Sequence, residues 1–170
     1  MKRTKWLDRK FPVIEDNGLL PSIIERLAGT PARAEEIIHR TNPGILAIKP
    51  DGKWSIKEQI GHLGDLEILF LGRIDDFENK LPQLRPADLS NEKTQTANHN
   101  AKDIKLLLSA FREQRMELVS RLRNLSDEQL RVSALHPRLK TPMRIIDHVN
   151  FVAEHDDHHL ASISEIIQSS

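Results

Sequence analysis

Residues 153–161 read Ala-Glu-His-Asp-Asp-His-His-Leu-Ala, and they hold three of the chain's eight histidines. They lie in a run without glycine or proline from Met143 to the C-terminus, which predicts one long helix. Side chains four residues apart lie on the same face of a helix, so His155 and His159 should point the same way. Their rings would then be close enough to bind one metal ion.

The apolar residues of this predicted helix indicate which face is buried. At about 100° per residue they gather on one side, at Ile145, Val149, Val152, Ile163 and Ile166. His159 falls inside this apolar arc and His155 at its edge. His158 lies further round, beside Phe151. Buried imidazoles need polar partners, and the spacing of four residues favours a divalent metal over ordinary hydrogen bonds.

The composition of the chain excludes several classes of protein. Its 170 residues suit one domain, residues 1–170, and its 25 basic and 25 acidic residues are well mixed, so no nucleic-acid partner is expected. The chain has no cysteine, which excludes a disulfide, a thiolate ligand and a thiol nucleophile of its own. It has neither an apolar run of about 20 residues nor an apolar signal segment, so we expect a cytoplasmic protein with no membrane partner.

Hydrophobic periodicity predicts three long helices, at about residues 55–80, 101–124 and 142–168. Ser55 and Glu58 fit a capping box at the start of the first, and Thr141-Pro142 should begin the last. Together with a helical N-terminal region, these elements predict an all-α four-helix bundle. The long connection 81–100 permits a crossover instead of a simple up-down order.

The N-terminal region should contain a strap followed by a broken helix. Residues 1–17 carry aromatic side chains and should pack as an extended strap against the body. The helical pattern of residues 19–28 ends at Gly29, and Thr30-Pro31 then begins another helix.

A third metal ligand must come from elsewhere in the chain, because a histidine pair is only half of a site. His62 is the only histidine of the second long helix, and it lies near the start of that helix. If the two helices pack together, His62 completes a three-histidine set with an open position. Gly61 and Gly64 bracket His62, which indicates either a group that approaches closely or close helix–helix packing.

Several charged residues of the predicted helices have surface roles or ion pairs as their expected roles. Four arginines of the 101–124 helix should be solvated or paired with Glu113 and Glu117, namely Arg112, Arg115, Arg121 and Arg123. Asp156 and Asp157 follow His155 too closely to share its direction, so they should face solvent or an interface.

Several polar residues are candidates for supporting roles at the site. Glu67 and Glu154 are candidates for orienting the imidazoles, with a surface ion pair as the alternative for each. His158 is a candidate hydrogen-bonding neighbour or general base. His99 and Asn100 are candidates for lining the mouth of a pocket, with an ordinary loop histidine as the alternative for His99. Structural roles are expected for the remaining histidines: His39, at a helix end, His136 and His148.

Two segments carry a resemblance to a known family. Residues 51–67 read Asp-Gly-Lys-Trp-Ser-Ile-Lys-Glu-Gln-Ile-Gly-His-Leu-Gly-Asp-Leu-Glu, and residues 154–160 read Glu-His-Asp-Asp-His-His-Leu. In their order and spacing, and in the Thr-Pro helix start, they resemble the DinB superfamily over essentially the whole chain. The resemblance implies a four-helix bundle with a three-histidine metal site, whose ligands match His62, His155 and His159.

The resemblance also implies an activity. Characterised members of this family include metal-dependent S-transferases that join a small thiol to an electrophile, such as bacillithiol transferases and mycothiol-dependent isomerases. We therefore expect a thiol-dependent S-transferase that acts on small electrophiles, forms a homodimer and uses Zn or Ni, with Fe or Mn as alternatives. A metal-dependent hydrolase and a non-catalytic dimeric binding module related to stress are the alternative hypotheses.

Overall fold

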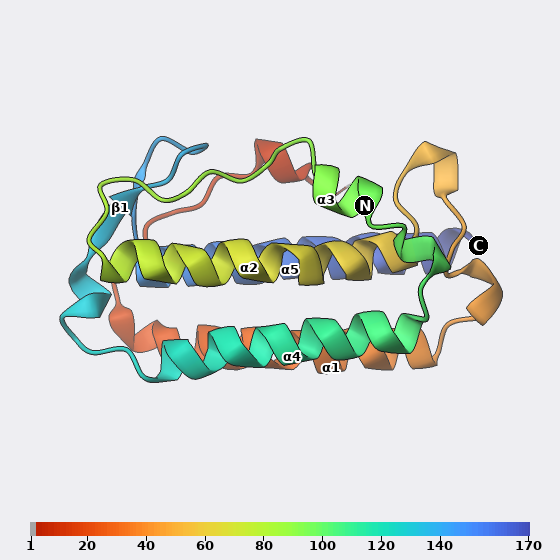
Figure 1. Ribbon diagram of the computed structural model, residues 1–170, viewed down its shortest axis with the longest axis horizontal. Coiled ribbons are helices and arrows are strands. Elements are labelled where there is room, and N and C mark those ends of the chain that lie inside the picture. Colours follow the sequence, from red (N-terminus) through yellow and green to blue (C-terminus); the bar gives the residue numbers. More distant parts are fainter. Residues whose placement is uncertain (1–2) are drawn as a thin grey trace.

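The computed structural model describes residues 3–170, and most of them are helical (Figure 1). Four long helices form the body: α1 (Leu20–His39), α2 (Ile56–Glu78), α4 (Ile104–Arg123) and α5 (Ile145–Ser169). Short helices lie between them: α3 (Glu92–Thr96), η1 (Trp6–Asp8), η2 (Asn17–Leu19), η3 (Pro43–Ile45), η4 (Pro50–Gly52), η5 (His99–Ala101) and η6 (Gln129–Arg131). The predicted all-α four-helix bundle is confirmed.

The order of the helices requires a crossover. Helices α1 and α5 run in one direction, whereas α2 and α4 run in the opposite direction (Figure 1). Helices α2 and α1 each pack against both α4 and α5. Because α2 and α4 are neighbours that run in parallel, residues 79–103 return along the length of the bundle and carry α3 on the way. The long connection that the sequence placed at residues 81–100 is therefore a crossover.

The predicted break in the N-terminal helix is wrong, because α1 continues through Gly29 and contains Pro31. A proline inside a helix leaves the carbonyl four residues earlier without its usual donor. That carbonyl belongs to Leu27, and it accepts a hydrogen bond of 3.2 Å from Nη1 of Arg115 on α4. Thr30 is accordingly a buried core residue of α1 and not the start of a second helix.

Two short strands precede the last helix, where the sequence predicted a loop and a helix start at Thr141-Pro142. Strand β1 (Ser133–Leu135) pairs antiparallel with β2 (Pro142–Arg144). Helix α5 therefore begins later than predicted, at Ile145, where the carboxylate of Asp147 accepts the backbone N–H of Arg144. The capping box at the start of α2 forms as predicted.

Three charged residues occupy core positions on three different helices. In α4 the spacing of three and four residues that defines the apolar stripe runs through Leu108, Phe111, Arg115, Leu118 and Leu122. The same spacing places Glu67 on the buried face of α2 and Asp156 on the buried face of α5. All three side chains are at most 2% exposed. Two predictions are therefore wrong: that Arg115 is solvated or paired with Glu113 or Glu117, and that Asp156 faces solvent or an interface.

These three side chains form one hydrogen-bonded network. Arg115 pairs with Glu67 at 2.5 Å and with Asp156 on the other side of its guanidinium. The hydroxyl of Thr30 on α1 donates to Asp156 at 2.8 Å. Burial raises the pKa of Glu67 to about 7, Arg115 opposes this increase, and Asp156 adds to it. All four long helices thus contribute to the network.

The close approach expected beside His62 involves a side chain of the crossover. A Cβ atom at Gly61 would overlap the ring of His99, which lies in η5. At Gly64 a Cβ atom would make only ordinary contacts, 3.8 Å from Phe111 of α4. Gly61 therefore lets the crossover pack directly on α2 next to the histidine, and Gly64 lies at an ordinary helix contact.

Among residues 3–170, no helix combines the length and the apolar character that crossing a lipid bilayer requires.

We predict that Arg115→Ala lowers the free energy of unfolding by about 3–5 kcal/mol, because it leaves Glu67 and Asp156 buried without their cation. The matched control is Arg112→Ala on the same helix, which removes a half-exposed pair with Glu35 and should cost less than about 1 kcal/mol. Urea unfolding followed by circular dichroism measures both values. Equal losses in the two variants would contradict a central role for the buried network.

Candidate functional site

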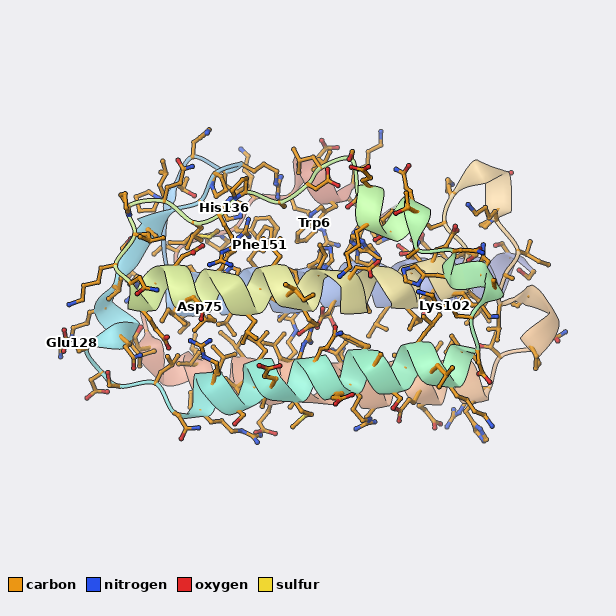
Figure 2. The ribbon with its side chains drawn as sticks, viewed as in Figure 1. Trp6, Asp75, Lys102, Glu128, His136 and Phe151 are labelled. Carbon is orange, nitrogen blue, oxygen red and sulfur yellow. The ribbon has the colours of Figure 1, made fainter. Side chains whose placement is uncertain are left out.

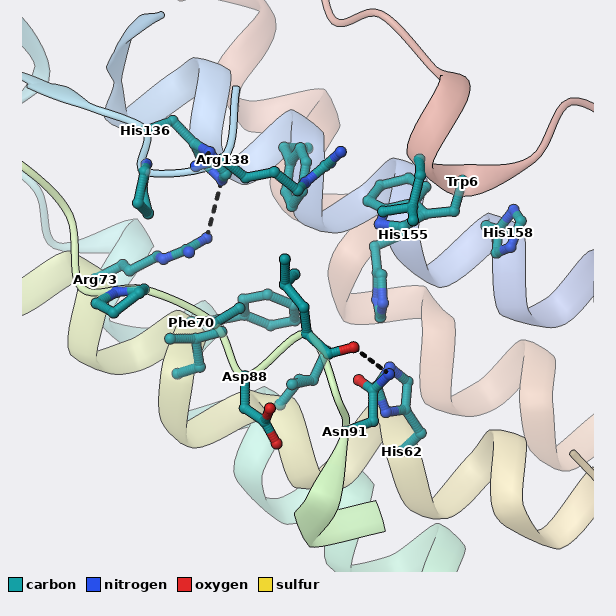
Figure 3. Close-up of a pocket in the computed structure, with 18 of the residues that line it drawn as sticks. Trp6, His62, Phe70, Arg73, Asp88, Asn91, His136, Arg138, His155 and His158 are labelled. Atoms are coloured by element: carbon teal, nitrogen blue, oxygen red, sulfur yellow. Dashed lines mark hydrogen bonds between the residues drawn. The ribbon is translucent and has the colours of Figure 1, made fainter. Parts of the chain in front are cut away.

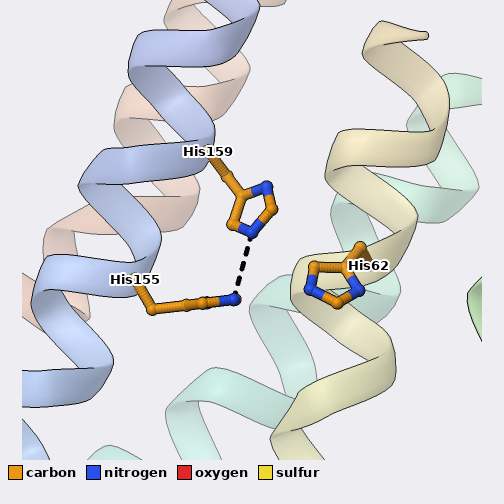
Figure 4. Close-up of side chains that lie close together, drawn as sticks. All are labelled: His62, His155 and His159. Atoms are coloured by element: carbon orange, nitrogen blue, oxygen red, sulfur yellow. Dashed lines mark hydrogen bonds between the residues drawn. The ribbon is translucent and has the colours of Figure 1, made fainter. Parts of the chain in front are cut away.

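Three buried histidines meet between α2 and α5. His62 on α2 lies opposite His155 and His159, which stand one turn apart on α5 (Figure 4). Each histidine offers a ring nitrogen, and these three nitrogens all lie within 4.8 Å of one another. The Nε2 atoms of His155 and His159 are 3.0 Å apart. The structure therefore brings together the three residues that the sequence selected, in an arrangement that can hold a metal ion.

The hydrogen bonds of His159 determine which of its nitrogens is free. Its Nδ1 lies 2.5 Å from the side-chain oxygen of Gln59, which is one turn before His62 on α2. An amide oxygen can only accept, so Nδ1 carries the hydrogen and the lone pair is on Nε2, toward His155. Gln59 thus orients His159, a role that the sequence did not indicate.

A chain of contacts to the crossover orients His62 in the same way. The hydroxyl of Thr94, on α3, donates to Asp65 at 2.9 Å, so it accepts from Nδ1 of His62 at 3.0 Å. The lone pair of His62 is therefore on Nε2. Asp65 also accepts from Nε2 of His99 at 2.8 Å. His99 is buried against Gly61 and holds Asp65 in place. It is not among the residues that line the cavity beside the histidines.

All three imidazoles are neutral at physiological pH. Burial lowers the pKa of His62 to about 4, with Asp65 opposing and His99 assisting the decrease. Burial also lowers the pKa of His155 and of His159 well below the ordinary value, and the neighbouring histidines assist. Neutral imidazole is the form that coordinates a metal. His155 differs from the other two because its Nδ1 has no hydrogen-bond partner among the described residues.

A cavity of about 370 Å³ lies next to the three histidines (Figure 3). Its walls are largely apolar and come from distant parts of the chain: Trp6 of the strap, Trp54, Leu66, Phe70, Leu89 of the crossover and Phe151. Trp6, His136 and Phe151 lie on the side of α2 and α5 that faces away from α1 and α4 (Figure 2). The strap, the crossover and the β hairpin therefore enclose one face of the bundle.

The strap packs on this face through Trp6, whose ring lies 5.1 Å from that of His155 and 5.6 Å from that of His158. The predicted strap covers residues 1–17, of which residues 1–2 lie outside the described part of the chain. Nη1 of Arg3 lies within 2.6–2.8 Å of both ring nitrogens of His158. Burial, followed by Arg3 and Arg9, lowers the pKa of His158 to about 4. His158 therefore lies on the cavity wall, outside the three-histidine cluster, and is a weak base.

The remaining candidates have other contacts. Glu67 is neither beside the imidazoles nor in a surface pair, because it belongs to the buried network with Arg115. Glu154 pairs with Arg26 at 2.6 Å near the surface. Asn100 accepts a hydrogen bond of 2.6 Å from the hydroxyl of Ser55 and thereby holds the crossover to the start of α2.

Three further predictions concern Asp157, His148 and His136. Asp157 is partly exposed and pairs with Arg33 at 2.7 Å. His148 is buried between Phe70 and Phe77, as expected for a structural residue. His136 lines the cavity.

Comparison with known proteins identifies the family. The family model of the DinB superfamily matches residues 26–163. A solved structure with a similar fold is YfiT from Bacillus subtilis, described as "a probable metal-dependent hydrolase with an unusual four-helix bundle topology". The two chains superpose with a TM-score of 0.82 and 21% sequence identity, over 95% of this chain and 93% of that one. The comparison with curated proteins found no match. Because the family match extends over most of the sequence, this chain belongs to the DinB superfamily.

Proposed function

We propose that the chain is a metal-dependent enzyme and that His62, His155 and His159 hold its divalent metal ion. The observation that carries this proposal is the convergence of three buried, neutral imidazoles, with ligand nitrogens within 4.8 Å of one another, beside an apolar cavity. The description of YfiT as a metal-dependent hydrolase supports a metal in this fold. All-imidazole ligation suits Zn, Ni, Fe or Cu. We propose Zn or Ni as the ion, with Fe or Mn as alternatives.

The surrounding residues fit such an ion. Gln59 and Thr94 accept the Nδ1 hydrogens of His159 and His62, which leaves the Nε2 lone pairs of both rings free for the metal. Partners of this kind fix the tautomer and the orientation of metal-binding histidines. A divalent metal bound there would lower the pKa of a thiol or a water molecule that joins it.

The lack of a strong base beside the cluster favours a thiol over water as the nucleophile. Among the described residues, Asp88 is the only carboxylate that lines the cavity. Its oxygens accept hydrogen bonds from Ser90 and from the backbone of Glu92, so it holds the crossover in shape. His158, with a pKa of about 4, is also a poor base. A thiol, with an ordinary pKa of about 8.5, ionises far more readily than water.

The proposed reaction is therefore transfer of an external thiol to a small electrophile. The thiol must come from outside because the chain has no cysteine. Hydrolysis is the second candidate, and the description of YfiT is the observation that favours it. A non-catalytic dimeric binding module would keep the bundle without either activity.

The first prediction concerns metal content. Protein purified without a histidine tag should contain about one divalent metal ion per chain, as a three-histidine site requires. His62→Ala, His155→Ala and His159→Ala should each lose it, whereas His39→Ala, at the exposed end of α1, should keep it. Mass spectrometry of the elements, with circular dichroism to verify folding, measures the outcome. Folded wild-type protein that neither contains metal nor takes up Zn or Ni would refute the proposal.

The second prediction tests the contact between His62 and the crossover. Thr94→Val removes the acceptor for Nδ1 of His62 and should weaken metal binding by about 10–100-fold. Thr96→Val is the control, because Thr96 lies on the same short helix and bonds only to carbonyls of that helix. Competition with a chromophoric chelator gives both affinities. Equal affinities in the two variants would show that Thr94 does not orient His62.

The third prediction distinguishes the two reactions. Zn- or Ni-loaded protein should accelerate thioether formation between a small thiol and 1-chloro-2,4-dinitrobenzene at least about tenfold over metal-free protein. His159→Ala should abolish this acceleration. Hydrolysis of 4-nitrophenyl acetate is measured in parallel without thiol. Metal-dependent ester hydrolysis with no thioether formation would favour the hydrolase instead.

A further inference from the structure

The cavity has a second polar region, at the end away from His158 (Figure 3). Arg73 from α2 and His136 from the segment between β1 and β2 line this end. Arg138 of the same segment begins beside His136 and extends along the cavity wall toward Trp6 and Phe151. Arg73 is only 2% exposed. The proposed metal chemistry uses none of these three side chains.

Neither arginine has a carboxylate partner among the described residues. The Nε of Arg73 donates to the backbone carbonyl of Arg85 at 3.1 Å. Asp76 is the acid whose charge acts on Arg73, and both of its oxygens accept hydrogen bonds from the side chain and backbone of Arg85. Arg138 packs its guanidinium over the rings of Trp6 and Phe151, at 6.0 and 5.8 Å, and its buried Nη2 has no hydrogen-bond partner among residues 3–170.

The hydrogen bonds of His136 leave further donors without an acceptor. Its Nδ1 lies 3.2 Å from the backbone N–H of Arg138 and 3.1 Å from that of Leu139, and both of these groups can only donate. Nδ1 is therefore the acceptor, and the hydrogen of the neutral ring is on Nε2. Nε2 then faces Nη1 of Arg73, 3.3 Å away, with a hydrogen on each nitrogen. Two N–H donors therefore face each other, and neither can accept a hydrogen bond from the other.

Positive charge dominates the electrostatics of this region. Burial, followed by Arg73 and Arg138, lowers the pKa of His136 to about 4. Burial lowers the pKa of Arg73 to about 10, Asp76 opposes the decrease, and Arg138 assists it. Buried cations normally have a hydrogen-bonded anion as partner.

We infer that this end of the cavity binds the carboxylate of a small organic acid whose apolar body lies along the cavity toward the three histidines. Nη1 of Arg73, Nε2 of His136 and Nη2 of Arg138 would supply the donors that the carboxylate oxygens accept. The apolar wall between the two ends accommodates an alkyl or aryl body. The placement of the reacting group at the histidines rests on the proposed function, whereas binding of the carboxylate does not.

The test uses two probes of nearly the same shape, 4-phenylbutyrate and its neutral amide, 4-phenylbutyramide. The chain's only two tryptophans, Trp6 and Trp54, both line the cavity, so tryptophan fluorescence reports binding, and calorimetry verifies it. Metal-free wild-type protein should bind the carboxylate at least about tenfold more tightly than the amide. Equal affinities for the two probes would overturn the inference.

Variants assign the preference to the arginines. The preference for the carboxylate over the amide should fall to less than about threefold in Arg138→Gln and in Arg73→Gln. Arg73→Lys should keep part of this preference, because the lysine retains the positive charge. Arg112→Gln, which changes a half-exposed arginine outside the cavity, should leave the preference for the carboxylate unchanged. A preference that survives in both glutamine variants would place the carboxylate elsewhere.

The metal provides a separate readout. A preference for the carboxylate that appears only in Zn-loaded protein would mean that the acid coordinates the metal, and would overturn the inference. Failure of the metal proposal leaves the preference of metal-free protein intact, whereas failure of the anion site leaves the metal content intact. The two results are therefore distinguishable. A thiol and an electrophile, each with a carboxylate, are then compared with their neutral forms. The comparison shows which of the two substrates supplies the carboxylate that binds at the arginines.

Discussion

The guanidinium of Arg115 is the contact on which the arrangement of the helices depends. It pairs with Glu67 of α2 and Asp156 of α5, and it donates to the Leu27 carbonyl of α1, which Pro31 leaves without a backbone donor. A charge buried without partners is costly, so the four helices must bring all of these groups together at once. Because successive helical residues are about 100° apart, fixing Asp156 at the centre of the bundle also fixes the direction of His155 and His159. The network thus connects the packing of the core to the geometry of the site.

The network contains two carboxylates for one arginine, and this imbalance affects its charge. If both acids were ionised, the centre of the bundle would hold a net negative charge in a medium that solvates it poorly. Burial raises the pKa of Glu67 to about 7 in spite of Arg115, so Glu67 can take up a proton and neutralise the network near physiological pH. Asp156 joins the network from α5, directly after His155 of the site, and Arg115 is one of the charges that lower the pKa of the His155 ring. The cation at the centre of the core therefore also acts on one histidine of the site.

The sequence predicted the parts of the fold that depend on periodicity within one segment. The long helices and the shared face of His155 and His159 follow from the spacing of apolar residues. His62, which the sequence also selected, joins them because α2 packs against α5. The prediction for Arg115 is wrong because acidic neighbours on its own helix are the only partners that the sequence indicates, although Phe111 and Leu118 put it on the apolar stripe. Its partners lie 41 and 48 residues away, and only the packed bundle identifies them. Thr94 could not be predicted, because it lies in a crossover whose path no periodic pattern specifies.

The two ends of the cavity differ in where their residues come from. The three histidines are on long helices whose rotation the buried network fixes, so the reactive end has little freedom to change. At the other end, His136 and Arg138 belong to the segment between two short strands, and the intervening wall includes the strap and the crossover. Connecting segments tolerate substitution far better than packed helices do. Change in these segments can alter the molecule that is bound without moving the histidines, so the bundle determines the type of chemistry and the connections determine its substrate.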